Sequence, residues 1–65
     1  MKITVNGTAT EVTAKDLPGV LRELGYGDGK VATAVNERFV PASARSSAVL
    51  GPGDRLEVVT PRQGG

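Results

Sequence analysis

The strongest constraint on the fold is that only one segment has the apolar spacing of a helix. Its apolar residues recur at i, i+3, i+4 and i+7, which places them on one helical face: Leu17, Val20, Leu21 and Leu24. Asp16 is the expected N-cap, Pro18 fits the first turn, and Gly25 fits the left-handed position that ends a helix of about ten residues. A chain of 65 residues forms one small domain. The helix is therefore expected to cover one face of a sheet.

The first twelve residues are predicted to form a β-hairpin. Asn6-Gly7 suits a two-residue type I′ turn between segments that favour strands. Such a turn fixes the pairs on one face as Val5 with Thr8, Ile3 with Thr10 and Met1 with Val12. The other face then has Thr4 opposite Ala9 and Lys2 opposite Glu11. Because the second face carries an opposite-charge pair, the first face is expected to face the core.

The rest of the chain is predicted to add two short strands and a final one. Residues 31–35 form a strand, 36–38 turn the chain into Phe39-Val40, and 42–50 form a loop with at most one helical turn. A turn at 51–54 leads to a strand over 55–59. This order predicts an α+β fold with a mixed sheet of four or five strands covered by one helix. If the last strand lies parallel to the first in the centre of the sheet, a right-handed crossover gives a β-grasp.

Composition excludes several functions. The chain has no His and no Cys, so the usual general base, thiol nucleophile and metal ligands are missing, and we do not expect an enzyme or a bound metal. The net charge is +1 and the charges are scattered, which argues against a nucleic-acid or membrane partner. The sequence begins with strand alternation and has no apolar segment of membrane-spanning length. We expect a soluble cytoplasmic protein.

The sequence ends on Gly64-Gly65, after a Pro61-Arg62-Gln63 spacer. Glycine has no Cβ, so two glycines can enter a slot too narrow for any side chain. With 9 glycines in 65 residues, this ending has a chance probability of roughly 2%. We expect a domain over residues 1–60 and a flexible tail over 61–65. When extended, such a tail spans roughly 16 Å, which is enough to deliver a terminal carboxylate into another protein.

The combined pattern resembles the ThiS family of ubiquitin-like sulfur carriers. The resemblance covers nearly the whole chain and rests on features that occur in the same order: the 2–7 hairpin start, the apolar helix, the hairpin from 34–36 to 39–41, Gly53-Asp54 before the last strand, and Gly64-Gly65. It implies a ubiquitin-like β-grasp fold. It also implies a protein that is a substrate of other enzymes and is not itself a catalyst.

The resemblance further implies the chemistry of the terminus. In such carriers an E1-like adenylating enzyme of the ThiF type uses ATP to activate the terminal carboxylate, here that of Gly65. A sulfur donor such as a cysteine desulfurase supplies sulfur that replaces AMP, and the thiocarboxylate passes sulfur to a thiazole synthase of the ThiG type. No cofactor is bound by the carrier. The tail residues Arg62, Gln63 and Gly64 would thread into the partner, although the two long polar side chains are also typical of a solvated tail.

Other functions remain open from the sequence. The chain also resembles the small subunit of molybdopterin synthase in its ending, and a carrier that feeds cysteine synthesis has the same chemistry. From another class, a ubiquitin-like binding or conjugation module would need an exposed apolar patch, which no run in the sequence indicates. The two aromatic residues, Tyr26 and Phe39, are candidate anchors for a partner. For Phe39 a place in the core is the expected one, because so few large residues are available to fill this domain.

Overall fold

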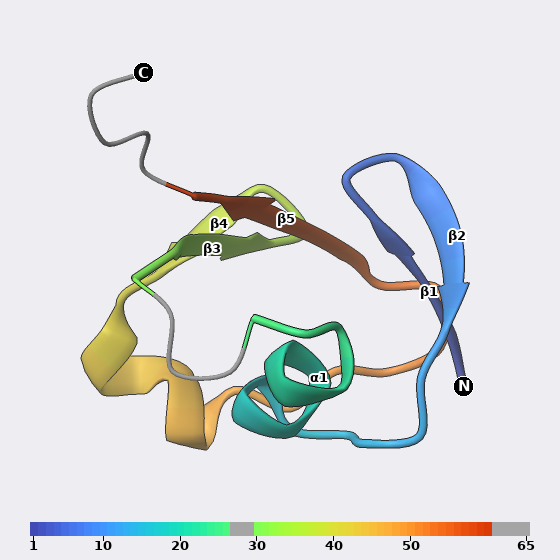
Figure 1. Ribbon diagram of the computed structural model, residues 1–65, viewed down its shortest axis with the longest axis horizontal. Coiled ribbons are helices and arrows are strands. Elements are labelled where there is room, and N and C mark those ends of the chain that lie inside the picture. The colour runs from blue at the N-terminus through green and yellow to red at the C-terminus, as the bar shows by residue number, and fades with distance from the viewer. Residues whose placement is uncertain (27–29, 61–65) are drawn as a thin grey trace.

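The computed structural model of the chain describes residues 1–26 and 30–60. Within these residues it contains five strands, one α-helix and one 3₁₀-helix (Figure 1). In chain order they are β1 (Lys2–Val5), β2 (Thr8–Glu11), α1 (Leu17–Glu23), β3 (Ala32–Val35), β4 (Arg38–Val40), η1 (Ala42–Ser47) and β5 (Arg55–Val59). The predicted tail over 61–65, and so its boundary with a domain over 1–60, lies outside the described residues.

The strands form one mixed sheet in the order β2-β1-β5-β3-β4. β5 lies in the centre, parallel to β1 and antiparallel to β3. α1 lies against one face of this sheet (Figure 1). This is the β-grasp arrangement that the sequence predicts, including the parallel placement of the last strand beside the first.

The first hairpin has the predicted turn and register. Asn6 and Gly7 both have positive φ, 50° and 84°, as a type I′ turn requires. Lys2 pairs with Glu11 and Ile3 with Thr10. The predicted inward face is the buried one, because Ile3 is 1% exposed whereas Lys2 and Glu11 are exposed.

The helix covers the sheet as predicted but is shorter. α1 has 7 residues, and Leu17, Val20 and Leu21 are buried in the core. Asp16 occupies the N-cap with extended backbone, yet its side chain makes no capping hydrogen bond. Gly25 ends the helix with φ of 92°, as expected. The other buried apolar side chains come from the strands and loops: Ile3, Val12, Leu50, Leu56 and Val58.

The segment after β4 corrects the prediction of a loop with at most one helical turn. η1 is a 3₁₀-helix of 6 residues, which is about two turns. The sequence lacks a helical apolar period here because η1 has no buried residue. It is fixed instead by polar contacts: Arg45 donates a hydrogen bond to the carbonyl of Val31. Beyond η1, the carbonyl of Ala48 accepts from the amide of Leu17 at 2.9 Å, which joins this segment to the start of α1.

The carboxylate of Glu23 fixes the loop that leads into α1. It accepts hydrogen bonds from the amide of Ala14 at 2.8 Å and from the amide and hydroxyl of Thr13, each at 2.9 Å for the closer oxygen. These bonds, first that from Ala14, lower the pKa of Glu23 below its ordinary value of 4.5. A side chain at the end of the helix therefore stabilises the connection at its beginning.

Glu23→Gln is expected to remove this stabilisation in a pH-dependent way. The folded-state pKa is depressed, so the contribution of Glu23 is complete above pH 4.5 and disappears as the pH falls through the lowered folded value. The difference in urea midpoint between wild type and variant should therefore be largest at neutral pH and shrink in acid. Glu57→Gln, at an exposed position of β5, is the control. A gap for Glu23→Gln that stays constant with pH would contradict this role.

Candidate functional site

β5 leads directly toward the predicted tail, and its side chains alternate between the two faces of the sheet. Leu56 is fully buried and Val58 is 6% exposed, so both face α1. Glu57 and Val59 are exposed and face the opposite side. The alternation continues to the end of β5: Val58 lies on the core side of the sheet and Val59 on the outer side.

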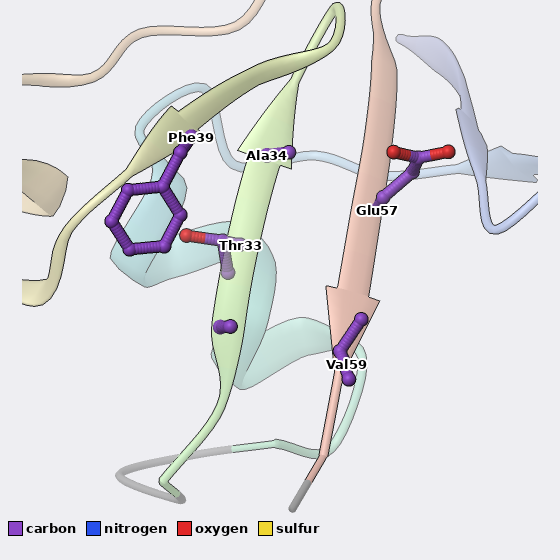
Figure 2. A pocket seen from close by; sticks show the side chains of 6 residues that line it. Thr33, Ala34, Phe39, Glu57 and Val59 are labelled. Carbon is purple, nitrogen blue, oxygen red and sulfur yellow. The ribbon is translucent and has the colours of Figure 1, made fainter.

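The outer side carries an apolar patch built from three strands. Val59 of β5 is opposite Ala32 of β3, and Phe39 of β4 is opposite Ala34 of β3. Figure 2 shows Phe39 and Val59 on either side of β3, with Glu57 at the border of the hollow between them. The hollow is open and has a volume of about 160 Å³. We call Ala32, Ala34, Phe39 and Val59 the outer-face patch.

The expectation that Phe39 belongs to the core was wrong. Its side chain is 68% exposed, and that of Val59 is 64% exposed. The reason is register: Asn36 and Glu37 form a two-residue turn with φ of 52° and 70°, which places Phe39 opposite Ala34. Ala34 points away from the buried side chain of Thr33, its neighbour in β3. No run in the sequence indicates this patch, because the patch joins residues that are distant in the sequence.

A sequence signal for this patch existed in the second hairpin. The turn at 36–37 repeats the conformation of the turn at 6–7, and both turns begin with asparagine. Had a two-residue turn been assigned there, the alternation of small Ala32 and Ala34 with larger neighbours would have placed Phe39 on the outer face. Tyr26, the other aromatic candidate, is half-buried and packs against the core.

The four predicted site residues, Arg62, Gln63, Gly64 and Gly65, lie outside the described residues. Across 1–26 and 30–60, no cluster of three or more acidic, His or Cys side chains is arranged to hold a metal ion. No helix in the same part of the chain is long and apolar enough to cross a membrane. Among the described residues, the structure places Val59 of the outer-face patch at the end of β5.

The comparisons with known proteins identify the family. The model of the ThiS family matches residues 3–65, which is almost the whole sequence. The chain belongs to the ThiS family. No curated protein matches the sequence.

Two solved structures share the fold of this ThiS-family chain. One is a crystal structure of the thiamine biosynthesis protein ThiS from Geobacter metallireducens, with a TM-score of 0.84, 23% identity and complete coverage of both chains. The other is an NMR structure of a thiamine biosynthesis protein from the same organism, with a TM-score of 0.81 and 23% identity, covering 100% of this chain and 88% of that one. The likeness extends to the ubiquitin-like β-grasp and its five-stranded sheet.

Phe39→Ala is expected to change the free energy of unfolding by no more than about 0.5 kcal/mol, because the ring is mostly solvated. Leu56→Ala, on the same sheet but fully buried, should cost about 2–5 kcal/mol. Urea denaturation of both variants measures the difference. A loss for Phe39→Ala as large as that for Leu56→Ala would show that Phe39 belongs to the core after all.

Proposed function

We propose that this chain is a sulfur carrier of thiamine biosynthesis and that the Gly65 carboxylate is the group that carries sulfur. The observation that supports this most is the ThiS-family match, which runs through residue 65 and so includes Gly64-Gly65. Both similar structures are described as thiamine biosynthesis proteins. The proposal assigns the β-grasp domain to recognition and the tail to chemistry.

The proposed chemistry begins with activation of the carboxylate. A carboxylate is a poor electrophile at neutral pH, so a ThiF-type enzyme first joins a Gly65 oxygen to the α-phosphorus of ATP and pyrophosphate leaves. A persulfide sulfur from the donor then forms a bond to the acyl carbon, and AMP leaves with the oxygen. The product of this step is an acyl disulfide with the donor cysteine. A second thiol, from a partner enzyme or a small-molecule reductant, then attacks the sulfur of the donor cysteine, so that the S–S bond breaks, the two thiols form a disulfide and the Gly65 thiocarboxylate is released. This thiocarboxylate gives its sulfur to a ThiG-type thiazole synthase. Because the first step consumes ATP, we place this cycle in the cytoplasm.

In this proposal the chain acts as a substrate. It contains neither His nor Cys, so the partner enzymes would supply the general base and the thiol groups. The absence of a cysteine is compatible with an activated acyl group, which a nearby thiol could intercept. Arg62, Gln63 and Gly64 would lie in the partner's channel, where the small glycine lets the backbone approach closely.

The outer-face patch is the proposed docking surface for the activating enzyme. An enzyme that reacts with Gly65 must approach the end of β5, and Val59 of the patch lies at that end. The large exposed side chains of Phe39 and Val59 border a hollow floored by small alanines, which suits an apolar side chain of the partner. Patch and tail would thus contact the same protein.

The same patch also favours one other class of function. A ubiquitin-like module that only binds or becomes conjugated to other proteins would use such a surface too. Carriers that feed molybdopterin or cysteine synthesis remain as alternatives within the carrier class. The final sulfur acceptor separates the carriers, and the chemical state of Gly65 separates carriers from binding modules.

The test is intact mass spectrometry of the full chain after incubation with ATP, the activating enzyme and the sulfur donor. We expect replacement of one oxygen by one sulfur at the C-terminus. Gly65→Ala, which adds only a methyl group, should keep the fold and lose most of this product because the channel has no room for a Cβ. An unchanged wild-type mass with partners that activate another carrier would contradict the proposal.

The docking role of the patch has its own test. Phe39→Ala should raise the KM of the activating enzyme for the carrier by about tenfold or more, with kcat little changed, as expected for a lost interface anchor. Val49→Ala is the matched control, because Val49 is also an exposed apolar residue, 72% exposed, but lies outside the patch. Equal KM values for the two variants would remove Phe39 from the interface.

A further inference from the structure

The backbone of β5 is hydrogen-bonded alternately to its two neighbours. The carbonyls of Asp54 and Leu56 accept from the amides of Thr4 and Asn6, both at 2.9 Å, so even-numbered residues face β1. The carbonyl of Arg55 accepts from the amide of Asn36 at 2.8 Å, so odd-numbered residues face β3. By this alternation, the amide and carbonyl of Val58 point toward β1.

β1, however, ends before it can reach Val58. The strand stops at Val5 and the chain turns away at Asn6-Gly7. Without another partner, the polar groups of Val58 would lack their ladder bonds at the place where β5 leaves the sheet.

The side chain of Asn6 takes the place of the missing strand. Its Oδ1 accepts a hydrogen bond from the Val58 amide at 2.8 Å, and its Nδ2 donates one to the Val58 carbonyl at 3.2 Å. A single amide side chain thus pairs with both backbone groups of Val58, which lies two residues before Thr60, the last residue that the structure describes.

The second hairpin contains the matching residue at the other end of β5. The Oδ1 of Asn36 accepts from the amide of Arg55 at 3.0 Å, and its Nδ2 donates to Asp54 Oδ1 at 3.2 Å. Because β1 is parallel to β5 and β3 is antiparallel, the two equivalent turns lie at opposite ends of β5. The Asn36 contact at Arg55 and the Asn6 contact at Val58 are therefore three residues, or about 10 Å, apart along β5.

From this arrangement we infer that Asn6 is a positioning residue for the sulfur-carrier reaction: its paired hydrogen bonds to Val58 fix the direction in which β5 delivers the tail to the activating enzyme. This inference rests on the proposed function. Docking through the outer-face patch brings the enzyme to the sheet, whereas the Asn6 contact aligns the last residues of β5 with the enzyme's channel. Loss of alignment lowers the fraction of docked carriers whose carboxylate reaches ATP.

The test compares Asn6→Gly with Asn36→Gly in the full chain. Asn6 and Asn36 have φ of 50° and 52°, a conformation that glycine adopts readily, so both variants keep their turns. Each variant loses two side-chain hydrogen bonds: those of Asn6 to Val58, or those of Asn36 to Arg55 and Asp54. Both should show similar, modest decreases in urea midpoint. Amide exchange measured by NMR should accelerate at Val58 in Asn6→Gly and stay slow there in Asn36→Gly.

The kinetic readout is carrier adenylation by the activating enzyme. For Asn6→Gly we expect kcat to fall by about tenfold or more with KM little changed, since misplacement by about 1 Å can cost up to 10²-fold in rate. Asn36→Gly should retain the wild-type kcat. Asn6→Asp keeps an acceptor for the Val58 amide and should recover part of the rate, a result that a loss of stability alone does not give.

The outcomes separate this inference from the proposed function. If wild type is adenylated and Asn6→Gly has the same kcat, or if both glycine variants lose rate in parallel, Asn6 has no positioning role although the carrier function stands. If wild type itself is not adenylated by an enzyme that activates another carrier, the proposed function is wrong. The positioning role of Asn6 is then wrong as well, because it depends on that function.

Discussion

The pairing of β5 with β1 on one edge and β3 on the other is the interaction on which the rest of the structure depends. It joins the two hairpins into one sheet, and it brings Leu56 and Val58 under α1. A chain of 65 residues has a small core, so its stability depends on hydrogen bonds along the whole length of the central strand. The asparagines of the two hairpin turns extend this pairing at both ends of β5.

The two faces of the sheet at β5 separate the residues that stabilise this small domain from those proposed to bind a partner. Residues on the face toward α1 form the core. On the opposite face, Phe39 of β4 and Val59 of β5 are exposed and border a hollow lined by small alanines. The separation follows from strand alternation alone. It allows a substitution on the outer face to alter partner binding while the folding energy, which depends on the inner face, is nearly unchanged.

Much of the fold could be predicted because local signals agreed with one another. Asn6-Gly7 specified both the turn and the register, and the apolar helix required a sheet to cover. The 3₁₀-helix at 42–47 was missed because it buries no side chain and so has no apolar period. Phe39 was assigned to the core because an aromatic residue in a small domain usually lies there, whereas its exposure depends on a turn at Asn36-Glu37 that lacks glycine. The contact of Asn6 with Val58 joins residues 52 positions apart and has no local signature.

We propose that the terminus of this chain carries sulfur to a thiazole. The most direct measurement loads the purified chain with radiolabelled sulfur, removes the activating enzyme and donor, and adds thiazole synthase with its other substrates. We expect the label to leave the carrier and to appear in the thiazole product in a single turnover. Label that stays on the chain in the presence of active synthase, or that is transferred only to another acceptor, would contradict it.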